Sequence, residues 1–257
     1  MNNIQVVRAF WGSLETYKPQ IEKAPRYDEE IIVWGKDNFE YLVNRGYRCI
    51  LVSDDPYDYT IAAAHTFIDH SSLIHKLKAI DIAVDKFKEI VFLDWDCYNV
   101  KNLDSSFYST IKEGNELQVP LYVYPKSALD KLVKSDIDIE YYNFFSKLAD
   151  YLEEHAYKLD DDFIIPNTGF IYCRSKIVTE KLLDIAIKNN LQTVPDELAV
   201  LYYAKELNLD LDGFIDTFEP SVINGKYQDN PEWIDSQTKL DNYIKSKVAK
   251  NIFFHHV

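Results

Sequence analysis

The sequence predicts an α/β protein with a mixed, mostly parallel sheet flanked by helices. Short apolar runs alternate with amphipathic helical patterns along the chain, which is typical of parallel strands joined by right-handed crossovers. The 257 residues, 47% of them hydrophobic, are enough for one large core that needs no covalent support. No internal repeat or flexible linker divides the chain. We therefore expect one domain over residues 1–257, composed of a first half (1–125) and a second half (126–257).

In the first half, apolar runs predict strands and the segments between them predict helices. The predicted strands cover residues 4–10, 30–34, 48–53, 89–94 and 119–124. The predicted helices cover residues 37–46 and 71–88. In the second helix, apolar residues from Leu73 to Phe87 recur every three or four positions and so lie on one face.

The second half is less regular. Residues 141–159, 176–189 and 196–208 have helical patterns. Residues 163–175 contain two extended pieces interrupted by turn-forming residues between Pro166 and Gly169. A turn-rich segment, 222–235, predicts a surface loop, and residues 251–257 predict a short strand that ends in two histidines.

Charge and cysteine usage limit the partners that the chain can have. Asp and Glu outnumber Lys and Arg by 42 to 28, so the net charge is −14. Nucleic acid and anionic membranes attract clustered positive charge, so both are poor expectations here. A basic stripe of Lys239, Lys245, Lys247 and Lys250 keeps a modified-base DNA acceptor open, although a solvated helix explains it equally well.

Several absences favour a cytoplasmic protein. The three cysteines are far apart and lie in or beside apolar runs, which is typical of core thiols in a reducing compartment. The N-terminal residues lack the basic start and apolar segment of a signal peptide, and no apolar run reaches the ~18 residues of a membrane span.

The segment "EIVFLDWD", residues 89–96, raises the main functional question. An apolar strand runs directly into Asp94 and Asp96, two carboxylates one residue apart. Residues i and i+2 of an extended chain point to the same side, and ligands of open α/β sheets gather at the carboxyl ends of strands. Hard oxygen ligands suit Mg²⁺ or Mn²⁺. The pair predicts a metal site, with loop acids that cap a turn as the alternative.

The segment "FLDWDCYNVKNL" resembles the DxD segment of nucleotide-sugar glycosyltransferases with the GT-A fold. The resemblance extends to the preceding helix, turn and strand. It implies that Asp94 and Asp96 hold Mn²⁺ or Mg²⁺ against the diphosphate of the donor, with Trp95 beside it. It also implies that a helix lysine faces the donor: Lys76 before Lys78, with two solvated lysines as the alternative.

Three further segments resemble the glycogenin-like and bacterial galactosyltransferase-like branch, whose enzymes retain anomeric configuration. "IIPNTGFIYCRS" is similar to the Asn-x-Gly segment of that branch, which implies Asn167 and Gly169 near the transferred sugar; a simple turn is the alternative. "VPDELAVLYY" is similar to the Asp-Gln pair that opens a helix, although Glu197 stands where Gln is usual. Asp196 would contact the sugar, or else serve as a helix N-cap.

The two ends of the chain complete the resemblance. "NIFFHHV" is similar to the late segment in which a histidine ligates the metal, so His255 or His256 is implied as a third protein ligand, with a frayed terminus as the alternative. The first strand ends in "RAFWGS", where this fold holds the nucleotide base. Arg8, Phe10 and Trp11 would contact the base there, with a buried Phe and Trp as the alternative, which is preferred for Phe10.

The resemblance implies a metal-dependent glycosyltransferase that moves a sugar from a nucleoside diphosphate donor, with a UDP-sugar expected, to a saccharide or another hydroxyl acceptor. Retention is expected, while an inverting enzyme would use Asp196 or Glu197 as a base. One rival is a sugar nucleotidyltransferase, which usually has a glycine-rich basic loop after the first strand; "AFWGSLETYK" has a single glycine. Another rival is a non-catalytic nucleotide-sugar-binding protein.

Overall fold

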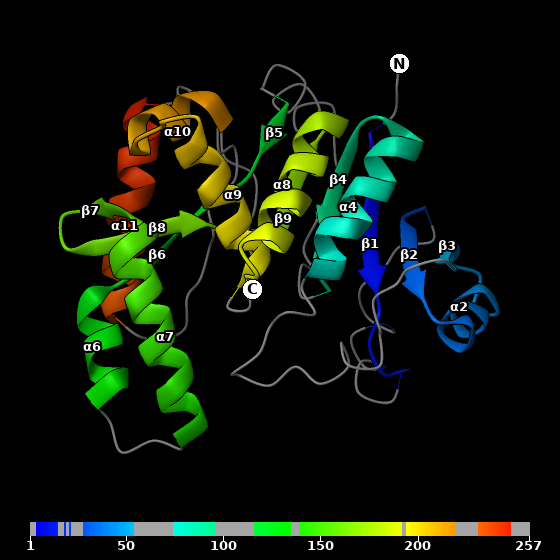
Figure 1. Ribbon diagram of the computed structural model, residues 1–257, viewed down its shortest axis with the longest axis horizontal. Coiled ribbons are helices and arrows are strands. Elements are labelled where there is room, and N and C mark those ends of the chain that lie inside the picture. Colours follow the sequence, from blue (N-terminus) through cyan, green and yellow to red (C-terminus); the bar gives the residue numbers. More distant parts are fainter. Residues whose placement is uncertain are drawn as a thin grey trace.

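The computed structural model describes residues 4–14, 18, 21, 28–53, 74–95, 116–134, 139–191, 194–218 and 231–247; for residues 134, 139–142 and 144 it describes the backbone alone. Figure 1 shows a central sheet with helices packed beside it and a second, smaller sheet at one end.

The central sheet contains six strands in the order β3-β2-β1-β4-β9-β5. The strands are β1 (Gln5–Phe10), β2 (Glu30–Trp34), β3 (Arg48–Val52), β4 (Ile90–Leu93), β5 (Leu117–Gln118) and β9 (Phe170–Cys173). β1 to β4 pair in parallel, whereas β9 runs antiparallel to both of its neighbours. The predicted class, an α/β fold with a mixed, mostly parallel sheet flanked by helices, is confirmed. Because β9 follows residue 125, this sheet is built from both predicted halves.

A second sheet is antiparallel, with the order β6-β8-β7. Its strands are β6 (Leu121–Tyr124), β7 (Tyr157–Leu159) and β8 (Asp162–Pro166). The two extended pieces predicted within 163–175 are therefore β8 and β9. The prediction of one helix over 141–159 is wrong at its end, because α7 (Ile139–His155) stops before β7. Tyr157 is buried while Lys158 is exposed, and this alternation is that of a strand paired with β8.

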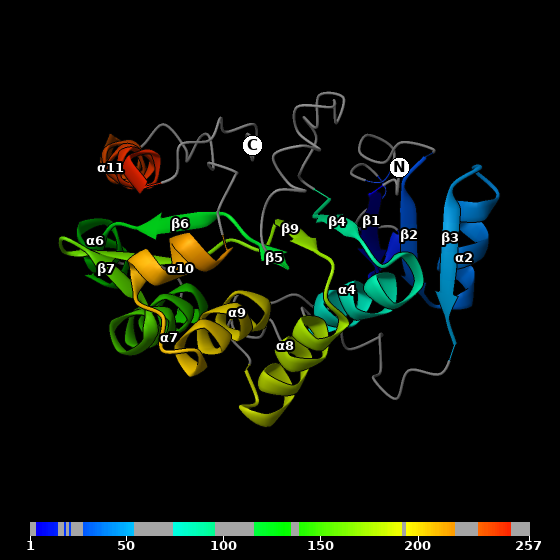
Figure 2. The same cartoon turned by 90° about the horizontal axis from the view of Figure 1, so that it is seen from above.

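The remaining helices are α2 (Lys36–Val43), α4 (Ile74–Phe87), α6 (Lys126–Lys134), α8 (Lys176–Lys188), α9 (Pro195–Glu206), α10 (Leu211–Phe218) and α11 (Pro231–Lys247). α4 packs on β1 and β4, α8 packs on α4, and α9 packs on α8 and β8, so that the three helices form one layer (Figure 2). Part of the predicted loop 222–235 is helical instead, since α11 begins at Pro231. Proline fits the first helical position because an N–H group at that position would have no intrahelical acceptor, so its absence costs nothing.

The core confirms the helix face predicted for residues 71–88. Leu77, Ile80 and Val84 are each at most 1% exposed and lie under the central sheet. Burial raises the pKa of the Cys49 and Cys173 thiols to about 12, and both are free cysteines, as expected for core thiols. Cys97 lies outside the described residues. Among the helices described, none has the length and apolar character needed to cross a membrane.

Candidate functional site

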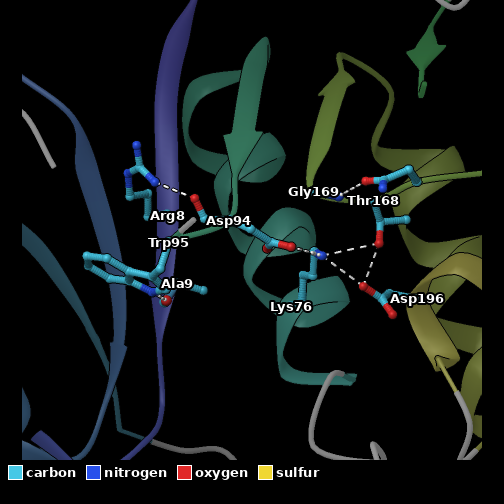
Figure 3. A network of polar contacts seen from close by, with 9 residues as sticks. Arg8, Ala9, Lys76, Asp94, Trp95, Thr168, Gly169 and Asp196 are labelled. Carbon is cyan, nitrogen blue, oxygen red and sulfur yellow. Dashed lines mark hydrogen bonds and ion pairs between the residues drawn. The ribbon is translucent and has the colours of Figure 1, made fainter. Parts of the chain in front are cut away.

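Four segments meet at the carboxyl end of β4. Asp94 follows the last residue of β4, and Lys76 lies in the first turn of α4. The turn from β8 to β9 contributes Thr168, and the first turn of α9 contributes Asp196. Figure 3 shows the Lys76 side chain reaching between Asp94 on one side and Asp196 with Thr168 on the other. Residues up to 120 positions apart in the sequence thus converge at the edge of the sheet where α/β ligand sites form.

The Lys76 ammonium group has three hydrogen-bonding partners. Its Nζ lies 2.7 Å from Oδ2 of Asp94, 2.9 Å from Oδ2 of Asp196 and 3.2 Å from the Thr168 hydroxyl. An ammonium has three N–H donors, so this arrangement uses all of them. Burial alone would lower the pKa of Lys76, but the adjacent charges of Asp196 and Asp94 outweigh it and raise the pKa above its usual range. Lys76 is therefore a permanent, buried positive charge.

The Asp196 carboxylate is buried, and one of its two oxygens has no hydrogen-bond partner among the described residues. Burial opposes its charge, yet Lys76 and the Thr168 hydroxyl, which donates to Oδ2 at 2.6 Å, together hold the pKa of Asp196 below its ordinary value. The N-terminus of α9 also favours a negative charge here. Within the part of the chain that the structure describes, the buried Oδ1 has no hydrogen-bond partner. A buried acceptor without a donor costs about 1–3 kcal/mol, so a donor from a bound ligand would be stabilising.

The backbone that presents Asp196 has an unusual conformation. Val194, which precedes α9, has φ 41° and ψ 57°, in the left-handed region that β-branched residues rarely adopt. Pro195 then occupies the first position of the helix and fixes the next φ angle. The alternative that Asp196 is the N-cap of α9 is not what the structure has, because Val194 is the N-cap and Asp196 lies inside the first turn.

Main-chain contacts hold Asp94 on both sides. Its N–H donates to the Gly169 carbonyl at 2.9 Å, and its carbonyl accepts from Nη1 of Arg8. The Gly169 N–H in turn donates to Oδ1 of Asn167 at 2.9 Å. Asn167 and Gly169 are therefore placed at the Asp94 end of the site.

Three residues near this edge were predicted to contact the donor: Arg8 in β1, Trp11 directly after β1, and Trp95 directly after Asp94. Arg8 is 1% exposed and forms an ion pair with Glu29, so its guanidinium is directed at protein groups. Trp11 stacks on His75 with ring centroids 5.8 Å apart. The Trp95 indole N–H donates to the Ala9 carbonyl, so this ring lies against β1. The contacts that the structure describes for these three residues hold the edge together.

Other predicted site residues are placed less closely or not at all. Lys78 is half-buried two positions beyond Lys76, on a different side of α4. Glu197 is half-buried, and because successive helix residues point about 100° apart, it faces away from the direction of Asp196. Asp96, His255 and His256 lie outside the described residues.

Sequence reasoning missed Thr168, which is 1% exposed and bonds to both Lys76 and Asp196. The signal was available in "IIPNTGF", because a hydroxyl residue stands between the two residues already singled out.

Replacing Thr168 with valine is expected to lower the free energy of unfolding by about 1–3 kcal/mol, because two buried charged groups each lose a polar neighbour. Thr168→Ser keeps the hydroxyl and should recover most of the loss. Urea denaturation of the three proteins measures the difference. If Thr168→Val is as stable as the parent, the hydroxyl does not stabilise the Lys76–Asp196 pair.

One predicted metal ligand, Asp94, lies within the part of the chain that the structure describes. Its side chain is 33% exposed at the end of β4, while Oδ2 contacts Lys76. A partly exposed carboxylate at this position fits a hard divalent cation that keeps water ligands. Among the residues described, no three His, Cys, Asp or Glu side chains gather as a complete metal site. The other predicted ligands are among residues that the structure does not describe.

Two lysines of the predicted basic stripe have acidic neighbours on the protein. Lys239 lies 3.0 Å from Asp235, and Lys247 lies 2.7 Å from Asp212. These pairs fit the alternative of a solvated helix.

No family model matches this chain, and no curated protein matches it. Solved structures do match over almost its whole length. Mouse xyloside xylosyltransferase 1, in its apo form, is 10% identical, with a TM-score of 0.46 over 99% of this chain and 97% of that chain. CMP:2-keto-3-deoxy-manno-octonic acid synthetase complexed with CTP is 7% identical, with a TM-score of 0.40 over 95% of this chain and 99% of that chain.

Proposed function

We propose that this chain is a cytoplasmic glycosyltransferase that moves a sugar from a nucleoside diphosphate donor to an acceptor hydroxyl, with retention of anomeric configuration. A UDP-sugar is the expected donor, and a saccharide is the first choice of acceptor. The donor would bind at the carboxyl end of β4, over Lys76, Asp94, Thr168 and Asp196.

The observation that carries the proposal is the buried Oδ1 of Asp196, which lacks a donor among the described residues. Its partner oxygen is already used by Lys76 and Thr168. A sugar offers several hydroxyl donors, and one of them would satisfy Oδ1 without disturbing the ion pair. Asn167, in the turn from β8 to β9, would donate its amide to a second hydroxyl.

The charge of the site favours a cation together with the diphosphate. One positive charge on Lys76 stands against two negative charges on Asp94 and Asp196, which leaves −1. A bare diphosphate would be repelled there. We propose that Asp94, Asp96 and either His255 or His256 hold Mn²⁺ or Mg²⁺. When bound, such an ion would supply positive charge against the departing diphosphate.

In the proposed reaction, some residues of the site would orient the donor sugar and others would hold the site's own side chains in place. Lys76 fixes the direction of the Asp94 carboxylate. Asp196 orients the donor sugar, and its negative charge stabilises the oxocarbenium-like transition state at the anomeric carbon. The acceptor oxygen bonds to that carbon from the face that the diphosphate leaves, the bond to the diphosphate oxygen breaks, and the departing diphosphate oxygen takes the hydroxyl proton. Glu197 follows Asp196 in α9 and points about 100° away from it, so it would face the acceptor side.

A donor screen tests this function. The purified chain is mixed with a panel of nucleoside diphosphate sugars, with Mn²⁺, with Mg²⁺ or with a chelator, and its melting temperature is followed. The correct donor should raise the melting temperature only with metal, by mass action, and should release nucleoside diphosphate when an acceptor is added.

Three other outcomes would contradict the proposal. Release of pyrophosphate from a nucleoside triphosphate and a sugar phosphate would identify a nucleotidyltransferase. Saturable donor binding without turnover on any acceptor would identify a binding protein. No response to any donor would exclude the whole class.

A further inference from the structure

We propose that Glu29 and Arg8 are positioning residues for Asp94. In this arrangement, Glu29 holds the Arg8 guanidinium, Arg8 holds the Asp94 carbonyl, and the Asp94 carboxylate is thereby set against Lys76. The inference deepens the proposed function and rests on it for one of its two tests. The other test depends on the backbone alone.

The Arg8–Glu29 pair is almost completely buried. Nε of Arg8 lies 2.7 Å from Oε2 of Glu29, and their side chains are 1% and 5% exposed. Arg8 occurs in β1 between Val7 and Ala9, both core residues, where an apolar side chain would be usual. Desolvating two charges offsets most of their attraction, and apolar residues of similar size are often as stable. The pair therefore needs an explanation other than stability.

The geometry of the guanidinium supplies that explanation. Arg8 uses Nε for Glu29 and Nη1 for the Asp94 carbonyl. These nitrogens belong to one rigid plane, so fixing one hydrogen bond fixes the direction of the other. Figure 3 shows Arg8 reaching from β1 to the Asp94 backbone, with Trp95 beside it. Glu29 thus acts on the site edge through a single rigid group.

The other side of Asp94 is tied to a different strand, because its N–H donates to the carbonyl of Gly169, next to β9. With both peptide groups held, side-chain rotation is the main freedom that Asp94 keeps. Its Oδ2 lies 2.7 Å from Nζ of Lys76 in the orientation observed. Loosening the carbonyl contact would let the carboxylate drift from the position that a metal ion and a diphosphate require.

The next residue, Glu30, provides a matched control. Glu30 is also 5% exposed and also pairs with an arginine, since Oε2 lies 3.0 Å from Arg48. Its second neighbour is Lys86, at 3.5 Å. Both of these partners are about half exposed and neither touches the site edge. Removing the charge from Glu30 therefore breaks the ion pairs of a buried carboxylate on the same segment without releasing Asp94.

The first test compares Glu29→Gln, Arg8→Lys and Glu30→Gln in donor binding. The Mn²⁺ concentration that gives half of the donor-induced thermal shift should rise about 10-fold in Glu29→Gln and in Arg8→Lys. Arg8→Lys keeps the positive charge but loses the planar guanidinium group. The same Mn²⁺ concentration should change less than twofold in Glu30→Gln. Equal changes in Glu29→Gln and Glu30→Gln, at equal loss of melting temperature, would overturn the inference.

The second test needs no donor and no metal. Hydrogen exchange of the Asp94 amide, read by NMR, reports how often its bond to the Gly169 carbonyl opens. Exchange should be about 10-fold faster in Glu29→Gln and Arg8→Lys and unchanged in Glu30→Gln. Faster Asp94 exchange in these two variants would support the positioning role. If the parent protein also showed no metal-dependent donor binding, the proposed function would be refuted while the positioning role would stand. Unchanged Asp94 exchange in both variants would refute the positioning role whatever the protein catalyses.

Discussion

Replacing Lys76 with methionine is expected to lower the free energy of unfolding by about 3–5 kcal/mol, the range for removing one partner of a buried ion pair. Methionine nearly matches the volume of the lysine stem, so the loss comes from charge. Asp196 is buried and would face the interior with the Thr168 hydroxyl as its remaining partner within this network.

The dependence of this loss on pH is a sharper test than its size. In the parent protein the pKa of Asp196 is lowered, so its stabilising contribution is present above its ordinary pKa of 3.8 and is lost as the pH falls further. Lys76 has a raised pKa, so its contribution is complete below 10.5 and is lost only at higher pH. Without Lys76, burial dominates and raises the pKa of Asp196. The variant should therefore gain stability as the pH falls from about 7 to about 4.

Urea denaturation across that pH range measures both slopes, and Lys176→Met is the control. Lys176 pairs with Asp81 at 2.6 Å but is 35% exposed, so its replacement should cost at most about 1 kcal/mol, with no change of slope. A flat pH profile for Lys76→Met would show that Asp196 is not an uncompensated buried charge in that variant.

The second large effect is expected in catalysis. Asp94→Asn should lower kcat/KM for the donor on the order of 100-fold, because it removes the one described carboxylate that fits a metal ligand. Stability should change by less than about 1 kcal/mol, because Asp94 is 33% exposed and Lys76 keeps Asp196 as its counter-ion.

Asp81→Asn is the matched control for that variant. Asp81 lies on α4 and pairs with Lys176 at 2.6 Å, as Asp94 pairs with Lys76, and it also accepts a hydrogen bond from the Thr179 hydroxyl at 2.8 Å, so it offers an Asp–Lys pair outside the site. It is 14% exposed, so its replacement should cost more stability than that of Asp94 and leave kcat/KM within twofold. An equal loss of kcat/KM in both variants would mean that Asp94 acts through stability.

Much of the fold could be predicted because its strands and helices have strong local patterns. The strand predicted at 30–34 has the bounds of β2, and the predicted helix 176–189 differs from α8 by one residue. The errors fall where tertiary contacts decide. The segment Tyr157–Leu159 is too short to show a strand pattern in the sequence, and it forms a strand because it pairs with β8. Pro231 looked like part of a loop and begins a helix.

The candidate site was predictable one residue at a time but not as a network. Asp94 follows from the apolar strand before it, and Lys76 and Asp196 from the resemblance to known enzymes. Nothing local shows that Lys76 is buried, because a lysine on an amphipathic helix is usually solvated. The role of Glu29 could not be predicted from the sequence either, because it depends on Arg8 and on Asp94, which is 65 positions away in the chain.

The reversed strand β9 has a consequence for how the chain is made. Among the described strands, β4 has β1 and β9 as its neighbours, so the backbone N–H and C=O groups along one edge of β4 have no partner strand until residues 170–173 have been synthesised. Unpaired strand edges promote association between nascent chains. Roughly 75 more residues must leave the ribosome after β4 before that edge is sealed, several seconds of exposure at common elongation rates. We therefore expect this topology to increase the need for chaperones during synthesis.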